Sequence, residues 1–181
     1  MVEFRGLVAK SKDYHSAAVY AITETWLSED VPDEAVQLEG FQLYRADRDT
    51  YLSGKTCCGG VCFFVNESWC TDVTVIQQHC SAALEHIIIN CRPFYSPREF
   101  SSFILACVYI PPDADVDEAQ STLAKHIMDA ERIHPDSAVI VLGDFNKANL
   151  SRALPKYQQQ VKCPTRGERT LDHCYCTIKN A

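Results

Sequence analysis

The segment 137–142, which reads Ser-Ala-Val-Ile-Val-Leu and leads directly into Gly-Asp-Phe-Asn, constrains the fold more than any other part of the sequence. A β-branched apolar run of this length predicts a buried strand, and Gly143 predicts the point at which the backbone turns. Asp144 and Asn146 would then lie at the carboxyl end of a strand, where α/β proteins place their chemistry. Aspartate can bind a metal or act on water, and asparagine can hold a phosphate oxygen or that same water. The alternative is a simple turn, since Gly, Asp and Asn are common turn residues.

The rest of the chain predicts more strands and one strong helix. Apolar or alternating segments typical of strands occupy 18–23, 60–65, 72–76, 84–91, 103–109, 138–142 and 170–178. Asp113 and Asp115 can cap a helix whose apolar stripe runs from Val116 to Ala130, and a weaker helix is predicted at 12–20. This many strands imply one large sheet or two sheets. Because no linker divides residues 1–181, we expect a single layered α/β domain.

The cysteines bear on the compartment of the protein. Ten cysteines in a secreted chain of 181 residues would suggest disulfides, but no signal segment and no membrane-spanning run is visible. Cys62, Cys91 and Cys107 lie inside apolar runs, where a free thiol packs like a small hydrophobic residue. We therefore expect an intracellular protein with reduced, mostly buried cysteines and no zinc. A zinc site is the alternative, because the cysteine pairs 58/62 and 174/176 have short spacings.

The charge distribution is uneven. A formal net charge of -7 argues against a general binder of polyanions, which normally carries an excess of Lys and Arg. From 147 to 169, however, basic residues outnumber the single acidic Glu168, and Lys147, Arg166 and Arg169 are the candidates for contact with nucleic acid. A phosphodiester backbone could lie along this segment, which directly follows the Asp/Asn turn. The alternative is a solvated loop.

Two further polar residues follow apolar segments. Glu24 comes just after the apolar segment 17–22 and is a candidate metal ligand; the alternative is an exposed glutamate beside a core Trp26. Tyr109 ends a strand before Pro111-Pro112, which cannot continue a sheet, so its phenol is expected at the rim. A phenol there can donate to developing phosphoryl charge or cap the core.

Asp172 lies in the alternating strand 170–178, on a largely apolar face where a carboxylate needs a partner. A metal, an arginine or a histidine would each serve. His173 points to the opposite face and is a poor candidate for that partner.

Taken in order, Glu24, Tyr109-Ile110-Pro111-Pro112, Gly143-Asp144-Phe145-Asn146 and Leu171-Asp172 resemble the motifs of the endonuclease/exonuclease/phosphatase superfamily. The resemblance runs through nearly all 181 residues. Within that superfamily, the segments 23–27 and 91–102 look like the endonuclease domain of non-LTR (LINE-type) retrotransposons. The resemblance implies a four-layer α/β sandwich, in which two mixed sheets lie face to face with helices outside.

The resemblance also implies a role for each site residue in an enzyme that depends on Mg²⁺ or Mn²⁺. Glu24 is similar to the metal-binding glutamate, and Tyr109 to the tyrosine at the phosphate. Asp144 matches the aspartate that acts on the attacking water, Asn146 matches its companion, and Asp172 matches an aspartate that pairs with a histidine. The implied function is a Mg²⁺-dependent endonuclease that nicks DNA inside the cell, with the nucleus as the implied location and with no membrane and no stable protein partner. The alternatives are an inactive remnant of that domain, or a phosphomonoesterase or phospholipid phosphodiesterase of the same superfamily.

The sequence departs from the family pattern at two places. The family's closing Ser-Asp-His motif would lie beyond Ala181, so the chain resembles a copy truncated before the last strand, and we expect slow nicking or none. The family's first strand corresponds to Glu3-Phe4-Arg5-Gly6-Leu7, with Glu3 where the family has Asn.

Overall fold

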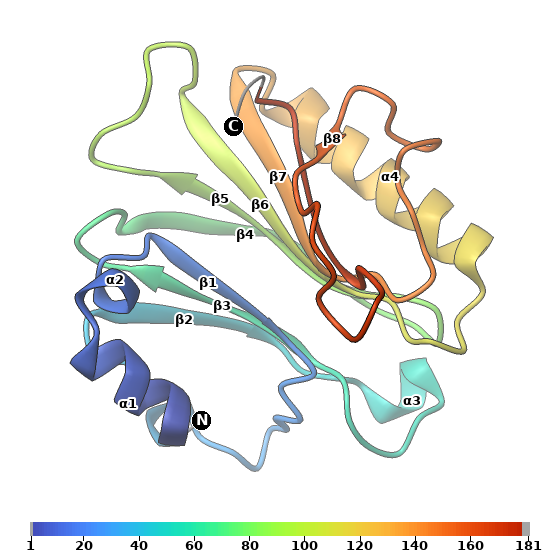
Figure 1. Ribbon diagram of the computed structural model, residues 1–181, viewed down its shortest axis with the longest axis horizontal. Helices are drawn as coiled ribbons and strands as arrows, with labels where there is room; N and C mark the ends of the chain where they lie inside the picture. Colours follow the sequence, from blue (N-terminus) through green and yellow to red (C-terminus); the bar gives the residue numbers. More distant parts are fainter. Residues whose placement is uncertain (1, 179–181) are drawn as a thin grey trace.

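Two β-sheets form the centre of the computed structural model, which describes residues 2–178 (Figure 1). The smaller sheet is antiparallel throughout and consists, in spatial order, of β1 (Val19–Thr23), β3 (Val61–Asn66) and β2 (Phe41–Ala46). The larger sheet is mixed and consists, in spatial order, of β4 (Asp72–Cys80), β5 (Glu85–Arg92), β6 (Ser102–Tyr109), β7 (Ser137–Asp144), β9 (Asp172–Cys176) and β8 (Gln158–Gln159). Within it, β6 and β7 pair in parallel and the other neighbours are antiparallel.

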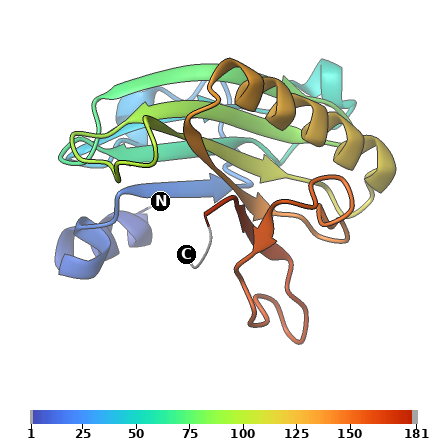
Figure 2. The same cartoon turned by 90° about the horizontal axis from the view of Figure 1, so that it is seen from above.

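Helices cover the outer faces of both sheets (Figures 1 and 2). The long α4 (Val116–Ile133) packs on the larger sheet, and α1 (Val2–Lys10) with the short α2 (Lys12–His15) lies beside the smaller one. A further turn of helix, α3 (Thr50–Ser53), and a 3-10 turn (Asp33–Ala35) lie in loops. The order helix, sheet, sheet, helix confirms the predicted α/β sandwich.

Strand β3 shows how the sequence builds the central layers. Every residue of β3 is buried, because both faces of the strand are covered. Val61, Phe63 and Val65 pack against the larger sheet, whereas Cys62 and Phe64 pack toward α1. The period-2 alternation of a strand therefore places consecutive side chains in two different cores.

Helix α4 forms as its sequence predicts. The Asp115 carboxylate accepts hydrogen bonds from the backbone N–H groups of Asp117 and Glu118, each at 3.0 Å. An aspartate cap of this kind is worth about 1 kcal/mol. The stripe that includes Leu123 and Ile127 is buried against the sheet. As the crossover between parallel strands, α4 brings the carboxyl ends of β6 and β7 to the same edge.

The sequence interpretation was wrong in several local details. Strand β2 was not predicted, and the expected helix at 12–20 is only α2, since β1 begins at Val19. The segment 3–7, expected as a strand, lies in helix α1. Strand β4 continues to Cys80 past a bulge between Val75 and Gln77. The last predicted strand is shorter than expected and begins at Asp172.

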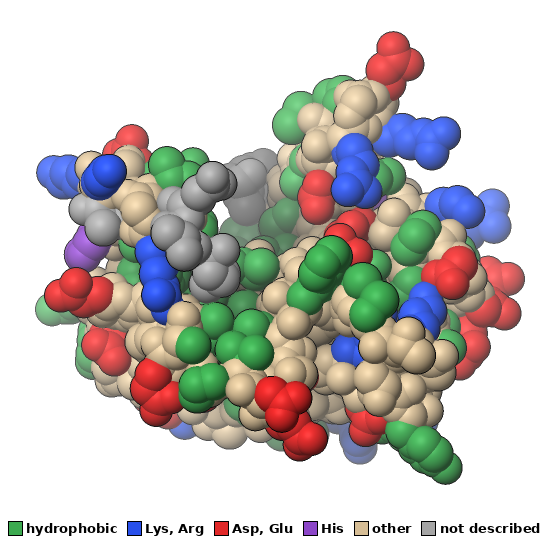
Figure 3. All heavy atoms as spheres, turned by 90° about the horizontal axis from the view of Figure 1, so that it is seen from below, with side chains coloured by type: hydrophobic (Ala, Val, Ile, Leu, Met, Phe, Trp, Pro, Cys, Tyr) green, Lys and Arg blue, Asp and Glu red, His purple; other side chains and the backbone are tan. Residues whose placement is uncertain are grey.

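Between β8 and β9, residues 160–171 form an arm that stands out from the sandwich (Figures 2 and 3). A tight hairpin closes the arm, in which the backbones of Arg166 and Arg169 exchange hydrogen bonds of 3.0 and 3.1 Å. Gly167 lies within this hairpin at a φ of 60°. Across residues 2–178, no helix is long and apolar enough to cross a membrane.

Candidate active site

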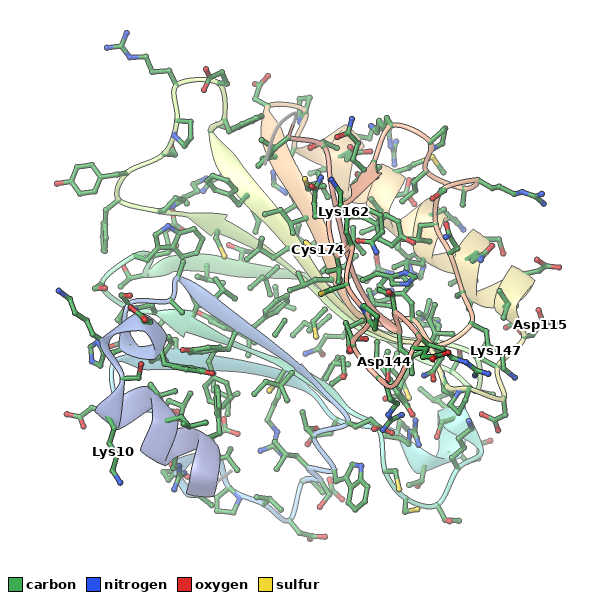
Figure 4. The ribbon with its side chains drawn as sticks, in the orientation of Figure 1. Lys10, Asp115, Asp144, Lys147, Lys162 and Cys174 are labelled. Atoms are coloured by element: carbon green, nitrogen blue, oxygen red, sulfur yellow. The ribbon has the colours of Figure 1, made fainter. Side chains whose placement is uncertain are left out.

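Three neighbouring strands carry polar residues at one edge of the larger sheet. Tyr109, the last residue of β6, pairs with Asp144, the last residue of β7. Asp144 in turn pairs with Asp172, the first residue of β9. Figure 4 shows Asp144 at this end of β7, with Lys147 in the turn that follows. Tyr109 lies 35 positions before Asp144 and Asp172 lies 28 positions after it, and strand register brings the three residues into one row.

Gly143 makes this register possible. It lies inside β7 opposite Val108, at a φ of +143°, and a Cβ atom there would collide with the Val108 carbonyl oxygen. The expectation that the backbone turns at Gly143 was therefore wrong, because the strand continues through Asp144. The turn comes at Asn146, which has a φ of 48°.

Glu24 reaches this row from the smaller sheet. The Tyr109 hydroxyl donates a 2.8 Å hydrogen bond to Glu24 Oε1. Glu24 lies just beyond β1 at a φ of 52°, and the next two residues are anchored because the Thr25 and Trp26 N–H groups donate to the carbonyls of Gly60 and Gly59 at 3.2 and 2.9 Å. This short turn therefore fixes the position of the Glu24 carboxylate.

Tyr109 lies at the rim of the sheet as expected, because it is the last residue of β6. Its side chain is nevertheless only 5% exposed, because the two sheets close over its ring. Its burial, and then its hydrogen bond to Glu24, raise the pKa of the Tyr109 phenol. The phenol therefore stays protonated and acts as a donor.

The alternative in which Trp26 is a core residue is wrong, since 67% of Trp26 is exposed next to Glu24.

Asp144 is half-buried and surrounded by like charge. Its Oδ1 accepts a 3.0 Å hydrogen bond from the Asn146 backbone N–H, and the Asn146 side-chain amide donates to the Ile110 carbonyl at 2.9 Å. Burial, followed by the negative charges of Asp172 and Glu24, raises the pKa of the Asp144 carboxyl. Three carboxylates thus act on one another at this edge of the sheet, which is the electrostatic setting of a site for a cation or for a general base.

Asp172 and His173 lie in different surroundings, the first exposed to solvent and the second packed against Phe145. The expected apolar surroundings of Asp172 are wrong, because Asp172 is exposed at the start of β9 and water can solvate it. His173 stacks on Phe145 with ring centroids 5.1 Å apart, and its Nδ1 and Nε2 lie 3.0 and 3.1 Å from the Tyr175 hydroxyl and the Thr170 carbonyl. His173 therefore belongs to the packing on the other face of the strand.

A basic groove lies beside the row of carboxylates. It has a volume of about 780 Å³ and is lined by Pro112, Asn146, Lys147, Arg166, Arg169, Thr170 and Leu171. The basic side chains are exposed, and two of the three come from the arm. Figure 3 shows basic side chains along the arm, with acidic ones at its tip and near its base. The three basic residues selected from the sequence thus line one surface together.

The sequence interpretation missed Arg48. Its guanidinium forms a buried ion pair with Glu85, and its Cζ atom lies 5.8 Å from the centroid of the Tyr109 ring. Arg48 Nη1 also donates to the Cys57 carbonyl at 2.8 Å. No spacing or apolar pattern distinguishes Arg48 from the charged residues around it in 45–49. Only the strand register, which places Glu85 opposite Tyr109, reveals its position.

Among the side chains that the structure describes, no three of His, Cys, Asp or Glu are arranged as a ready-made metal cage. One or two carboxylates at this edge would be a small ligand set for a metal. Such a coordination is common for Mg²⁺, which keeps several waters and also binds substrate phosphates.

Comparisons with known proteins bear on the fold. No protein-family model and no curated protein matches the sequence. Among solved structures, the human Nocturnin catalytic domain with bound sulfate is 13% identical at a TM-score of 0.68, covering 98% of this chain and 75% of that one.

Two bacterial structures are similar as well. An endonuclease/exonuclease/phosphatase family protein from Bacteroides thetaiotaomicron is 14% identical, with a TM-score of 0.59 and coverage of 97% of this chain and 74% of that one. The 3′ phosphatase NExo from Neisseria, bound to a product DNA hairpin, is 13% identical, with a TM-score of 0.56 and coverage of 97% and 80%. The chain therefore has the α/β sandwich fold of the endonuclease/exonuclease/phosphatase proteins.

Proposed function

We propose that this protein is a metal-dependent phosphodiesterase that nicks DNA, of the type that LINE-like retrotransposons encode. The observation that carries the proposal is that Glu24 meets the row containing Tyr109 and Asp144 beside the basic groove. The retrotransposon affinity rests on the sequence resemblance of the segments 23–27 and 91–102.

The residues at this edge fit a divalent cation. Glu24 and Asp172 place negative charge near Asp144, and this charge adds to burial in raising the pKa of the Asp144 carboxyl. A divalent cation held by Glu24 would offset that negative charge, and oxygen ligands of this kind suit Mg²⁺ or Mn²⁺. When bound, such a metal supplies Lewis-acid stabilisation of charge on a phosphoryl oxygen.

The protein's own groups supply the remaining chemistry. Asp144 orients or deprotonates the attacking water in this proposal, and its raised pKa, which makes it a stronger base than an exposed aspartate, supports that role. Asn146 sits at the junction of Asp144 and the groove and can help to hold that water. If Glu24 turns to a cation, the protonated Tyr109 hydroxyl is released from its bond to Glu24 and can donate to the phosphoryl oxygens as negative charge develops on them.

The basic groove favours a polymeric substrate over a small phosphate ester. A monoester needs one anion site, whereas Lys147, Arg166 and Arg169 extend positive charge away from the carboxylates and onto the arm. Basic side chains in such a row neutralise successive phosphates of a nucleic acid. The NExo structure with its DNA hairpin supports nucleic acid as the substrate class.

The test is hydrolysis of three substrates in parallel. Supercoiled plasmid, p-nitrophenyl phosphate and sphingomyelin vesicles are each incubated with the protein in Mg²⁺, in Mn²⁺ and in excess chelator. We expect slow conversion of plasmid to open circles, which requires the metal and still exceeds hydrolysis of the other two substrates. Preferred hydrolysis of the monoester or the vesicles would contradict the proposal, as would the absence of any metal-dependent nicking.

A further inference from the structure

Two adjacent thiols lie at the border of the candidate active site. Cys57 is exposed and Cys58 is half-exposed, and their Sγ atoms are 3.1 Å apart. Five of the ten cysteines, in contrast, are buried in the sandwich. Core packing therefore does not explain the Cys57-Cys58 pair.

The loop that carries these thiols holds two parts of the site in place. The Cys57 carbonyl accepts from Arg48, the residue whose guanidinium lies near the Tyr109 ring. A Cβ at Gly59, whose φ is +74°, would run into the Arg48 guanidinium, so the loop lies directly against that side chain.

The same loop anchors the turn after β1. The carbonyls of Gly59 and Gly60 accept the hydrogen bonds from Trp26 and Thr25 that fix the Glu24 turn, and the Gly60 N–H donates to Glu85 Oε2 at 2.6 Å. The conformation of residues 57–60 is thus linked to both Arg48 and Glu24.

We propose that Cys57 and Cys58 are an oxidisable vicinal dithiol, and that its conversion to a disulfide by a low-molecular-weight disulfide displaces loop 57–60 and lowers the activity of the site. The effect on activity rests on the proposed function, whereas the oxidation and the movement of the loop do not.

The exchange reaction balances. The exposed Cys57 thiolate attacks the small disulfide, which forms a mixed disulfide and releases one small thiol. Cys58 then loses its proton and attacks the Cys57 sulfur, which forms the Cys57–Cys58 bond and releases the second small thiol. Two protein thiols are oxidised by two electrons, and one small disulfide is reduced to two thiols.

Ring closure has to change the backbone. Adjacent Cα atoms are about 3.8 Å apart, whereas the Cα atoms of a disulfide are usually about 4.4–6.8 Å apart. No rearrangement can widen the spacing of adjacent Cα atoms, so the ring forms only with strain. Closing the two sulfurs from 3.1 Å to about 2.0 Å turns the peptide between Cys57 and Cys58, whose carbonyl Arg48 binds. A disulfide that is strained and exposed is also readily reduced, as a reversible modification requires.

Formation of the Cys57–Cys58 disulfide should be faster at higher pH. The hydrogen bond with the Cys57 sulfur, followed by partial burial, raises the pKa of the Cys58 thiol. Less Cys58 thiolate is available at neutral pH as a result, so the resolving step should accelerate as the pH rises.

The experiment treats the protein with oxidised glutathione in a Cys163→Ser background, which removes the other exposed thiol. Three quantities are measured: the disulfide by peptide mapping, amide hydrogen exchange at residues 25–26, and plasmid nicking. We expect a Cys57–Cys58 disulfide, faster exchange at 25–26, and nicking that falls about tenfold and recovers with dithiothreitol, because misplacing a reacting group by about 1 Å can cost about 10²-fold.

The matched control is the Cys57→Ser/Cys58→Ser protein, in which glutathione should change neither exchange nor nicking. Glutathione adducts without a Cys57–Cys58 bond would overturn the proposal. A disulfide that leaves the exchange at 25–26 unchanged would also overturn it. If the reduced protein does not nick plasmid, the proposed function fails, while the disulfide and the exchange still decide whether the dithiol moves the loop.

Discussion

The hydroxyl of Tyr109 is a permanent hydrogen-bond donor in the folded protein. Burial and the bond to Glu24 both stabilise its neutral form, so the pKa of the phenol rises further above its ordinary value. Asp144 is shifted upward as well, but from a low starting value, which brings it closer to the range useful for a general base. Burial therefore produces a fixed proton donor and a stronger base at paired positions of the neighbouring strands β6 and β7.

Replacing Tyr109 with phenylalanine tests the donor alone. The Tyr109→Phe protein keeps the ring that packs between the sheets and loses only the hydroxyl bonded to Glu24. We expect plasmid nicking to fall by about 10²-fold, the usual cost of removing one donor to developing charge, with little change in melting temperature. Unchanged nicking would mean that the phenol serves only to position Glu24.

At the residue scale, the sequence predicts the groups that stand at strand ends and misses those held by long-range contacts. Asp144 and Asn146 follow a clear apolar run, and Tyr109 precedes two prolines, so their chemistry is visible in the sequence. Arg48 lies in a charged loop, and its importance depends on Glu85, which belongs to a strand of the other sheet. The local sequence pattern around Arg48 contains no information about its ion pair with Glu85.

At the scale of elements, helix α4 and the strands beneath it enclose a cluster of three histidines. His86 on β5 is fully buried, and its Nε2 lies 2.9 Å from Nδ1 of His126 on α4. His79 on β4 stacks on the His86 ring at 5.4 Å. Around the cluster, Glu118 faces His79, while Lys125 and Asp129 lie near His126.

This cluster predicts loss of stability in acid. Burial, and then the neighbouring rings of His126 and His79, lower the pKa of His86 to about 3. An unfolded histidine takes up a proton below about pH 6.5, whereas the folded protein resists that uptake until about pH 3, so stability falls as the pH falls through this window. Between pH 7 and pH 5 the cost is about 2 kcal/mol at about 1.4 kcal/mol per pH unit.

Urea unfolding at pH 7 and pH 5 checks this expectation. The wild-type protein should lose about 2 kcal/mol more than a His86→Gln protein between the two pH values, because glutamine does not titrate. Equal losses in the two proteins would show that His86 is not the group responsible.

The basic residues of the arm lead to a separate prediction about DNA binding. If Arg169 contacts a phosphate, Arg169→Gln should weaken binding to DNA of any sequence and reduce the slope of log K against log salt by about 1. Lys125→Gln removes an equally exposed positive charge from α4, on the far side of the sheet, and serves as the matched control. The measurement is fluorescence anisotropy of a labelled duplex over a range of salt concentrations, and equal slopes for the two variants would exclude the arm as the binding surface.

Helices and strands whose apolar residues recur with one clear period could be predicted from the sequence. Those whose structure depends on contacts with distant parts of the chain could not. Helix α4 has a cap, an apolar stripe and a proline after its end, and it forms as expected. Strand β2 is half-buried along most of its length, and its pairing with β3 decides that it is a strand. Segment 3–7 packs its helix against the smaller sheet, an outcome that depends on tertiary contacts rather than on local propensity.

At the scale of the whole molecule, topology converts separate motifs into one site. Parallel β6 and β7 bring Tyr109 and Asp144 to the same edge, antiparallel β9 returns Asp172 to it, and the face-to-face packing of the sheets adds Glu24. The net charge of -7 is likewise not uniform, because the basic groove faces the same edge. The sequence predicts the two-sheet sandwich, but strand order and register exist only in the folded chain.

The central claim is that this edge of the sheet is a phosphodiesterase site, and plasmid nicking by two aspartate variants tests it most directly. Asp144→Asn alters the half-buried end of β7, whereas Asp136→Asn alters an exposed aspartate just before the other end of the same strand. We expect Asp144→Asn to reduce metal-dependent nicking by at least about 10²-fold, because it removes the base, and Asp136→Asn to leave the rate unchanged. If Asp144→Asn nicks as fast as Asp136→Asn while both remain folded, the site proposed at the end of β7 is wrong.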